Sequence, residues 1–110
     1  MDIVAELKKY RLYKSRISDY ENYLTSTSYE RDVTFTERKN YMEHKEKVAS
    51  IENFLNSLSD DERFVIENFD VAGNPWWKVA ELHKRQWGVY FSVETLRKKR
   101  QSALKKFKRL

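Results

Sequence analysis

Residues 92–110 read SVETLRKKRQSALKKFKRL and carry eight lysines and arginines against one acid, Glu94. Ser92 can cap a helix here, because its hydroxyl can accept from a free backbone N–H of the first turn, and Glu94 suits the positive end of the helix dipole. The apolar residues fall close to a three-four spacing, which is typical of one buried helical stripe. These residues are Val93, Leu96, Ala103, Leu104, Phe107 and Leu110. The stretch predicts a basic helix with one anchored face and one cationic face.

The rest of the composition favours helices throughout. The chain has 110 residues with two glycines, one proline and 35% charged side chains, so the turn-forming residues typical of β-rich folds are scarce. The formal net charge is +5. Residues 1–58 hold ten basic and ten acidic side chains, and residues 59–73 hold one against five. The positive excess therefore gathers at the C-terminus. It would attract a polyanion, although a charge run is also typical of a merely solvated face.

Several classes of protein are disfavoured by composition. Without cysteine there is no disulfide framework, thiol nucleophile or cysteine-type zinc site, which suits a reducing cytosol. No apolar run approaches the length of a signal sequence or a membrane span, so we expect a cytoplasmic protein without a membrane partner. The sequence offers no nucleophile–base pair, phosphate-binding glycine loop or metal cluster, and we expect no enzyme and no cofactor.

The first half of the chain predicts two long helices. Apolar and aromatic residues from Asp2 to about Leu24 follow a heptad-like stripe, and a second such stripe follows a Ser/Thr-rich loop over 25–35. Thr36 is the expected cap of the second helix. The two stripes can cover each other in an antiparallel hairpin over 1–57, or they can form an intermolecular coiled coil and make a homodimer.

Further helix boundaries are predicted after residue 57. Ser59 and Glu62 form an S-x-x-E capping box, so a third helix begins there, with an acidic start that should lie away from any bound phosphate. Asn74 can cap the next helix with Pro75 at its first position. Gly88 is the residue best able to adopt positive φ in the turn before the basic helix.

Four side chains in this part have both structural and functional interpretations. The adjacent Trp76 and Trp77 could line a ligand pocket, but in so small a chain we expect them to supply core. His44 and His83 lack a second ligand at a metal spacing, so we expect structural roles and no metal site. Three short helices ending in a basic one then amount to a helix-turn-helix layout over 58–110, in which the last helix lies in the major groove.

The same region also resembles a known family. The run LSDDERFVI at 58–66 is similar to the L-x-x-x-E-R-x-V-[IL] opening of region 4 in sigma-70-type RNA polymerase sigma factors. Residues 92–108 resemble its recognition helix, and Val79 with Ala80 stand at its apolar-plus-small pair. So short a chain is similar to small phage and mobile-element regulators of the ArpU and RinA type. It departs from the family in having several more residues between Ala80 and Ser92, and in having His83 where leucine is preferred.

The resemblance implies roles for individual residues. Glu94 and Lys98 would read bases, with Glu94 accepting from cytosine N4, and Ser92 would contact phosphate as well as cap the helix. Glu94 fits equally well as a simple dipole partner, and both roles stay open. The expected DNA-binding set is Ser92, Val93, Glu94, Thr95, Arg97, Lys98, Gln101 and Lys105.

The sequence thus predicts an all-α protein with a helical hairpin and a helix-turn-helix module. The expected function is a sequence-specific transcriptional regulator that binds double-stranded DNA, with RNA polymerase as a further candidate partner. Two alternatives remain. One is an adaptor or anti-regulator whose basic helix engages an acidic protein, and the other is a DNA-packaging component like a phage small terminase subunit.

Overall fold

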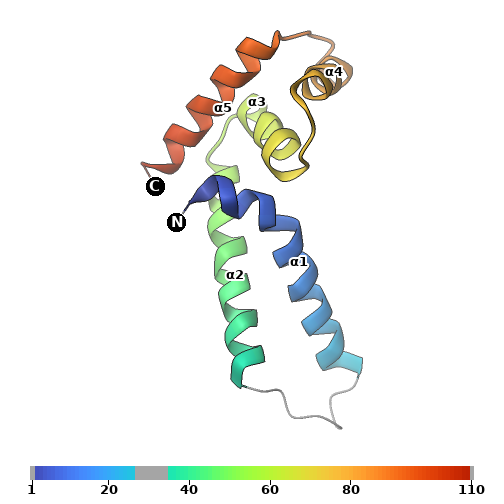
Figure 1. Ribbon diagram of the computed structural model, residues 1–110, viewed down its shortest axis with the longest axis vertical. Coiled ribbons are helices and arrows are strands. Elements are labelled where there is room, and N and C mark those ends of the chain that lie inside the picture. Colours follow the sequence, from blue (N-terminus) through green and yellow to red (C-terminus); the bar gives the residue numbers. More distant parts are fainter. Residues whose placement is uncertain (1, 27–34, 110) are drawn as a thin grey trace.

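The computed structural model describes residues 2–26 and 35–109, and within them it contains helices and no strand. The molecule is elongated, with extents of 55 × 30 × 19 Å. Two long helices project from a more compact group of short ones (Figure 1). The elements are α1 (Ile3–Ser26), α2 (Phe35–Asn56), α3 (Asp60–Val65), the π-helix η1 (Ile66–Val71), α4 (Trp76–Trp87) and α5 (Val93–Phe107). The predicted all-α class is confirmed.

α1 and α2 lie side by side and run in opposite directions (Figure 1). Their seam is aromatic: the rings of Tyr20 and Tyr41 stack at 4.4 Å, and those of Tyr13 and His44 at 5.2 Å. The Tyr13 hydroxyl donates to the Glu6 carboxylate at 2.6 Å, so the buried phenol is satisfied. The expected cap Thr36 is wrong, because α2 already begins at Phe35. Most of the predicted loop over 25–35 lies outside the described residues.

The third predicted helix begins as expected and then changes its winding. Ser59 accepts from the backbone N–H of Glu62, and the Glu62 side chain accepts from that of Ser59, so the capping box is confirmed. From Ile66 onward the helix is a π-helix, which the sequence did not predict. At its end the Ala72 N–H donates to the Glu67 carbonyl, five residues back.

α4 begins one residue later than expected. Pro75 is its N-cap, with extended backbone and no side-chain cap bond, so the predicted cap Asn74 is wrong. Proline cannot donate from its own nitrogen, and as N-cap its carbonyl instead accepts from Val79 N–H at 3.1 Å. The helix ends at Gly88, whose φ of 72° confirms the predicted left-handed turn residue.

Substituting Gly88 by alanine is expected to destabilise the protein by about 1 kcal/mol. No atom lies within 4 Å of the Cβ that alanine would add, so the cost comes only from the positive φ. The free energy of unfolding in urea measures this cost. Gly88→Asn is the matched control, because asparagine tolerates positive φ better, and it should lose less stability than Gly88→Ala. Equal losses would contradict this explanation.

The core consists of two clusters. One joins the α1–α2 pair to α5 through Leu7, Ile51 and Phe54, with Ala103 buried and Phe107 half-buried against them. The other holds α3, α4 and α5 together through Val65, Val79, Ala80 and Leu96. The division at residues 57/58 stays a prediction, since side chains from both sides share the first cluster. Within the described part of the chain, no helix is long and apolar enough to cross a bilayer.

Candidate nucleic-acid interface

α5 starts from a well-defined cap. Ser92 has extended backbone, and its hydroxyl accepts from the Thr95 N–H at 3.2 Å, which confirms the predicted N-cap. Glu94 occupies the first turn and forms an exposed ion pair of 3.6 Å with Lys98, one turn later. This pair tethers two of the expected base-reading side chains to each other in the free protein. Such exposed pairs contribute little stability and exchange readily for other partners.

One side of α5 is buried and the other is open. Leu96 and Ala103 are fully buried, while Val93, Leu104 and Phe107 are half-buried along the same stripe. Leu110, also predicted for the stripe, lies outside the described residues. Successive residues of a helix lie about 100° apart around its axis, and on this basis six exposed side chains fall within one third of the circumference. These are Glu94, Arg97, Lys98, Gln101, Lys105 and Lys108.

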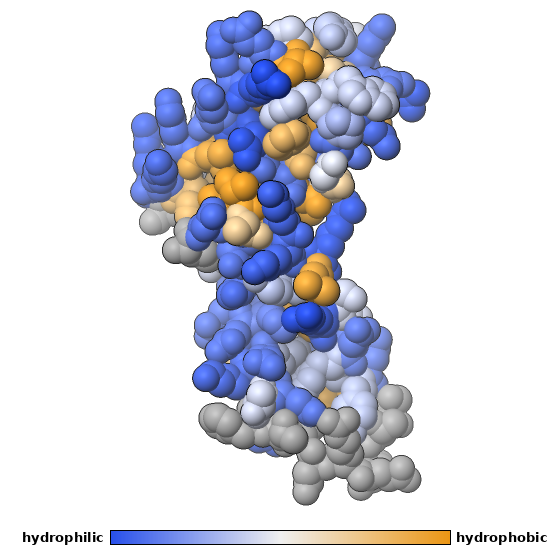
Figure 2. All heavy atoms as spheres, viewed as in Figure 1, coloured by the Kyte–Doolittle hydropathy of each residue, from blue (hydrophilic) through white to orange (hydrophobic). Residues whose placement is uncertain are grey.

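Most of the predicted DNA-binding set is therefore brought to one exposed surface. Ser92 and Thr95 are exposed at the N-terminal tip, beside the six residues of the open face. Val93 is the exception, because it turns partly into the core. The tip lies at the end of α5 far from α1, whose N-terminus lies near the other end of α5 (Figure 1). In Figure 2, hydrophilic residues line the upper left edge of the molecule, where α5 lies in the same view of Figure 1.

The expectation that the lysines and arginines of the basic helix lie on a free cationic face is wrong for three of them. Arg100 forms a bidentate pair with the buried Asp70, with nitrogen–oxygen distances of 2.8 and 2.9 Å. Lys99 lies 3.3 Å from Asp61, and Lys106 pairs with Glu62. The acids come from α3 and η1, which pack beneath α5. The acidic start of α3 thus neutralises cations next to the buried stripe.

The remaining cations keep their charge available. Five exposed cations are left on α5 and the turn that follows it, and Lys98 alone among them pairs with an acid. Within residues 2–26 and 35–109, no ion pair involves the other four. These are Arg97, Lys105, Lys108 and Arg109. The open face is therefore strongly positive even after the internal pairs are counted.

Glu62 is the centre of the contact between α3 and α5. Its carboxylate accepts from the Ser102 hydroxyl at 2.8 Å, from Lys106 and from the Ser59 backbone. Burial alone would raise the pKa of Glu62, but these hydrogen bonds outweigh it and lower the pKa from 4.5 to about 2. The ionised carboxylate therefore stabilises the fold.

This depressed pKa predicts loss of stability in acid. The contribution of Glu62 is fully present above about pH 4.5, the usual pKa, and is lost as the pH falls through about 2. The free energy of unfolding should drop by about 3 kcal/mol over that window on account of Glu62. Urea titrations at several pH values measure the drop. Glu62→Gln keeps a capping side chain but no charge, and it should flatten this part of the profile; an unchanged profile would contradict the assignment.

Four side chains form a stack that the sequence did not reveal. The rings of Trp76 and Phe69 are nearly parallel at 4.0 Å. Arg97 lies over Trp76 at 5.9 Å, and Arg100 lies over Phe69 at 5.1 Å. One end of the stack is neutralised by Asp70, whereas Arg97 presents an unpaired guanidinium beside the open face. A cation held on an aromatic face is oriented before binding.

The expectation that Trp76 and Trp77 both supply core is wrong for Trp77. Trp76 is half-buried in the stack, but Trp77 is 66% exposed. Trp76 stacks on Phe69, and Trp77, about 100° further round α4, is left outside that contact. Trp77 therefore adds an exposed aromatic surface to α4.

His83 is a buried residue surrounded by aromatic rings. Its side chain is 1% exposed and packs against the rings of Phe64, Trp87 and Phe91. Nδ1 lies 2.9 Å from the Val89 carbonyl oxygen and must donate to it, and Nε2 lies 3.5 Å from Asp61. Burial, and then Arg16 and Lys47, lower the pKa of the other histidine, His44. No group of three metal-ligating side chains occurs among the described residues.

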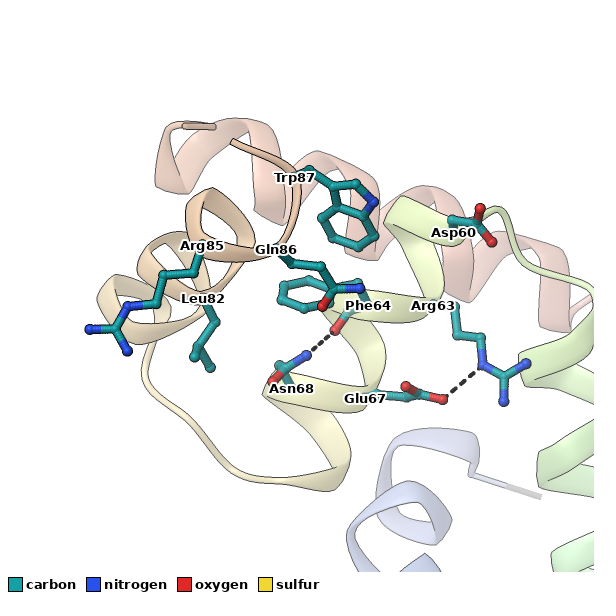
Figure 3. A pocket seen from close by; sticks show the side chains of 9 residues that line it. All are labelled: Asp60, Arg63, Phe64, Glu67, Asn68, Leu82, Arg85, Gln86 and Trp87. Carbon is teal, nitrogen blue, oxygen red and sulfur yellow. Dashed lines mark hydrogen bonds and ion pairs between the residues drawn. The ribbon is translucent and has the colours of Figure 1, made fainter. Parts of the chain in front are cut away.

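An open groove of about 660 Å³ lies on the surface between α4 on one side and α3 with η1 on the other. Figure 3 shows Phe64 and Trp87 on its wall, with Arg63 paired to Glu67 at 2.8 Å and the Asn68 amide donating to the Phe64 carbonyl. On the far rim, Arg85 pairs with Glu81. Four of the six polar side chains that line the groove already bond within the protein, so few are left for a ligand; these four are Arg63, Glu67, Asn68 and Arg85. The open face of α5 is the better candidate site.

No family model, curated protein or solved structure matches this chain, so the resemblance to sigma region 4 stays a prediction.

Proposed function

We propose that this protein is a sequence-specific DNA-binding transcriptional regulator, and that α5 enters the major groove. The observation that carries the proposal is the open face of α5, where exposed cations lie on a helix fixed from behind by Leu96 and Ala103. α3 with η1, α4 and α5 would form the helix-turn-helix module, and α1 with α2 the preceding hairpin. In this arrangement a rigid DNA-binding module is attached to a separate helical hairpin.

The dimensions of α5 support this use. Its 15 residues make a rod about 22 Å long, and with side chains it is about 10–12 Å across, which matches the width of the major groove. Cations on the open face would contact phosphates, while Glu94, Lys98 and Gln101 would reach base edges from successive turns. Arg97, oriented on Trp76, fits a phosphate contact.

The resemblance to sigma region 4 supports the finer features of the proposal. A regulator of phage or mobile-element type would act in the cytoplasm and use the α1–α2 pair either to dimerise or to dock on RNA polymerase. No catalytic step is assigned to the protein.

Salt dependence tests the function directly. Wild-type protein is titrated with labelled duplex DNA at several salt concentrations, and the logarithm of the binding constant should fall linearly with that of the salt concentration. A slope of about −4 corresponds to neutralisation of four or five phosphates. Absence of duplex binding at low salt would overturn the proposal.

A further inference from the structure

The connection between α4 and α5 exposes two hydrophobic side chains. After Gly88, the side chains of Val89 and Tyr90 are 50% and 62% exposed. Connections of this kind are usually polar, since exposed apolar groups gain nothing from water. Because they are neighbours and lie next to the N-terminus of α5, they are a candidate contact for whatever binds that helix.

The backbone of this connection is held firmly from inside. The Val89 carbonyl accepts from Nδ1 of the buried His83, and Phe91 packs on the same imidazole ring at 4.5 Å. Val89 and Phe91, the neighbours of Tyr90 in the chain, are therefore both held in place, while the Tyr90 ring is exposed. A segment already ordered in the free protein loses little conformational entropy when it binds.

Tyr90 also lies beside the tip of α5. It precedes the N-cap Ser92 by two residues, a chain distance of at most about 7 Å. In Figure 1 the connection lies between the end of α4 and the start of α5 at the top of the molecule. Any polyanion that receives the tip of α5 comes within reach of this ring. A protein partner at Tyr90 would have to occupy the same space.

We infer that Val89 and Tyr90 form a second, apolar contact with the duplex that α5 binds, packing on deoxyribose at the minor-groove edge beside the occupied major groove. This inference rests on the proposed function. Deoxyribose presents its carbon atoms at that edge, and other DNA-binding proteins are known to place apolar side chains in the minor groove. The contact would add affinity without neutralising phosphate.

The experiment uses a duplex selected from a random pool by the wild-type protein. Tyr90→Ser should weaken binding about tenfold, as expected for loss of one aromatic contact, and should leave the salt slope unchanged because no charge is removed. Hydroxyl-radical cleavage, which reports the exposure of each deoxyribose, should show lost protection at the flank of the site only. Thermal unfolding of the variant should match wild type, since Tyr90 is exposed.

The matched control is Met42→Ser, which removes a 56% exposed apolar side chain from α2. It should change neither affinity nor the cleavage pattern. If Tyr90→Ser binds the selected duplex with wild-type affinity and protection, the inference is overturned. Val89 and Tyr90 would then not contact DNA, and a protein partner would be the remaining occupant of this surface. If the wild-type protein selects no duplex at all, the proposed function itself fails.

Discussion

Replacing Arg97 and Lys98 together by alanine is expected to weaken binding to duplex DNA by about tenfold to a hundredfold at moderate salt. Both side chains are exposed on the open face, and neither buries a charge that must be compensated when it is removed. Loss of the phosphate contact of Arg97 should reduce the salt slope by about 0.9, whereas loss of Lys98, which would contact a base, should lower the affinity with a smaller change of slope. Fluorescence anisotropy with labelled duplex at several salt concentrations measures both quantities.

The control for this experiment removes equal charge elsewhere. Arg38→Ala with Lys39→Ala takes two exposed cations from the start of α2, at the end of the molecule far from α5 (Figure 1). It should keep the slope within a few tenths of wild type, because long-range charge is screened within about 10 Å at 0.1 M salt. Equal weakening by the two double variants would show that net charge alone attracts DNA, and α5 would lose its assignment as the reading helix.

Local chemistry made two helix starts and one helix end predictable. Ser59 with Glu62, and Ser92 with its first turn, satisfy backbone groups only a few residues away, so their sequence spacing determines the interaction. Gly88 is likewise identified by its own conformational freedom. Asn74 failed because two neighbouring residues competed for one boundary, and Pro75 took the cap position.

The internal neutralisation of α5 could not be read from sequence. Arg100 and Asp70 are 30 residues apart, and Lys106 and Glu62 are 44 apart. A charge count treats each lysine or arginine alike, whereas packing decides which ones meet an acid. The candidate surface is accordingly smaller than the sequence implies, but its exposed residues Arg97, Lys98, Gln101 and Lys105 all belong to the predicted set.

Phe54→Ala is expected to lower the free energy of unfolding by about 3–5 kcal/mol, a large part of the 5–15 kcal/mol typical of a domain. The ring is fully buried and meets Phe107 of α5 edge-on at 5.5 Å. Alanine would leave a cavity where α2 touches the C-terminal half, and this part of the core cannot collapse without moving α5. Urea unfolding followed by circular dichroism measures the loss.

The same titration tests whether the α1–α2 pair and the C-terminal helices unfold together. Since Leu7 and Ile51 share a cluster with Ala103, we expect wild type to unfold in one transition, reported alike by circular dichroism and by the fluorescence of Trp76, Trp77 and Trp87. Leu12→Ala, at a 46% exposed site on α1, is the control and should cost less than about 0.5 kcal/mol. If tryptophan fluorescence in Phe54→Ala kept its wild-type midpoint while circular dichroism lost an early phase, the hairpin would be an independent unit. The shared cluster would then contribute nothing to holding α5 in place for DNA.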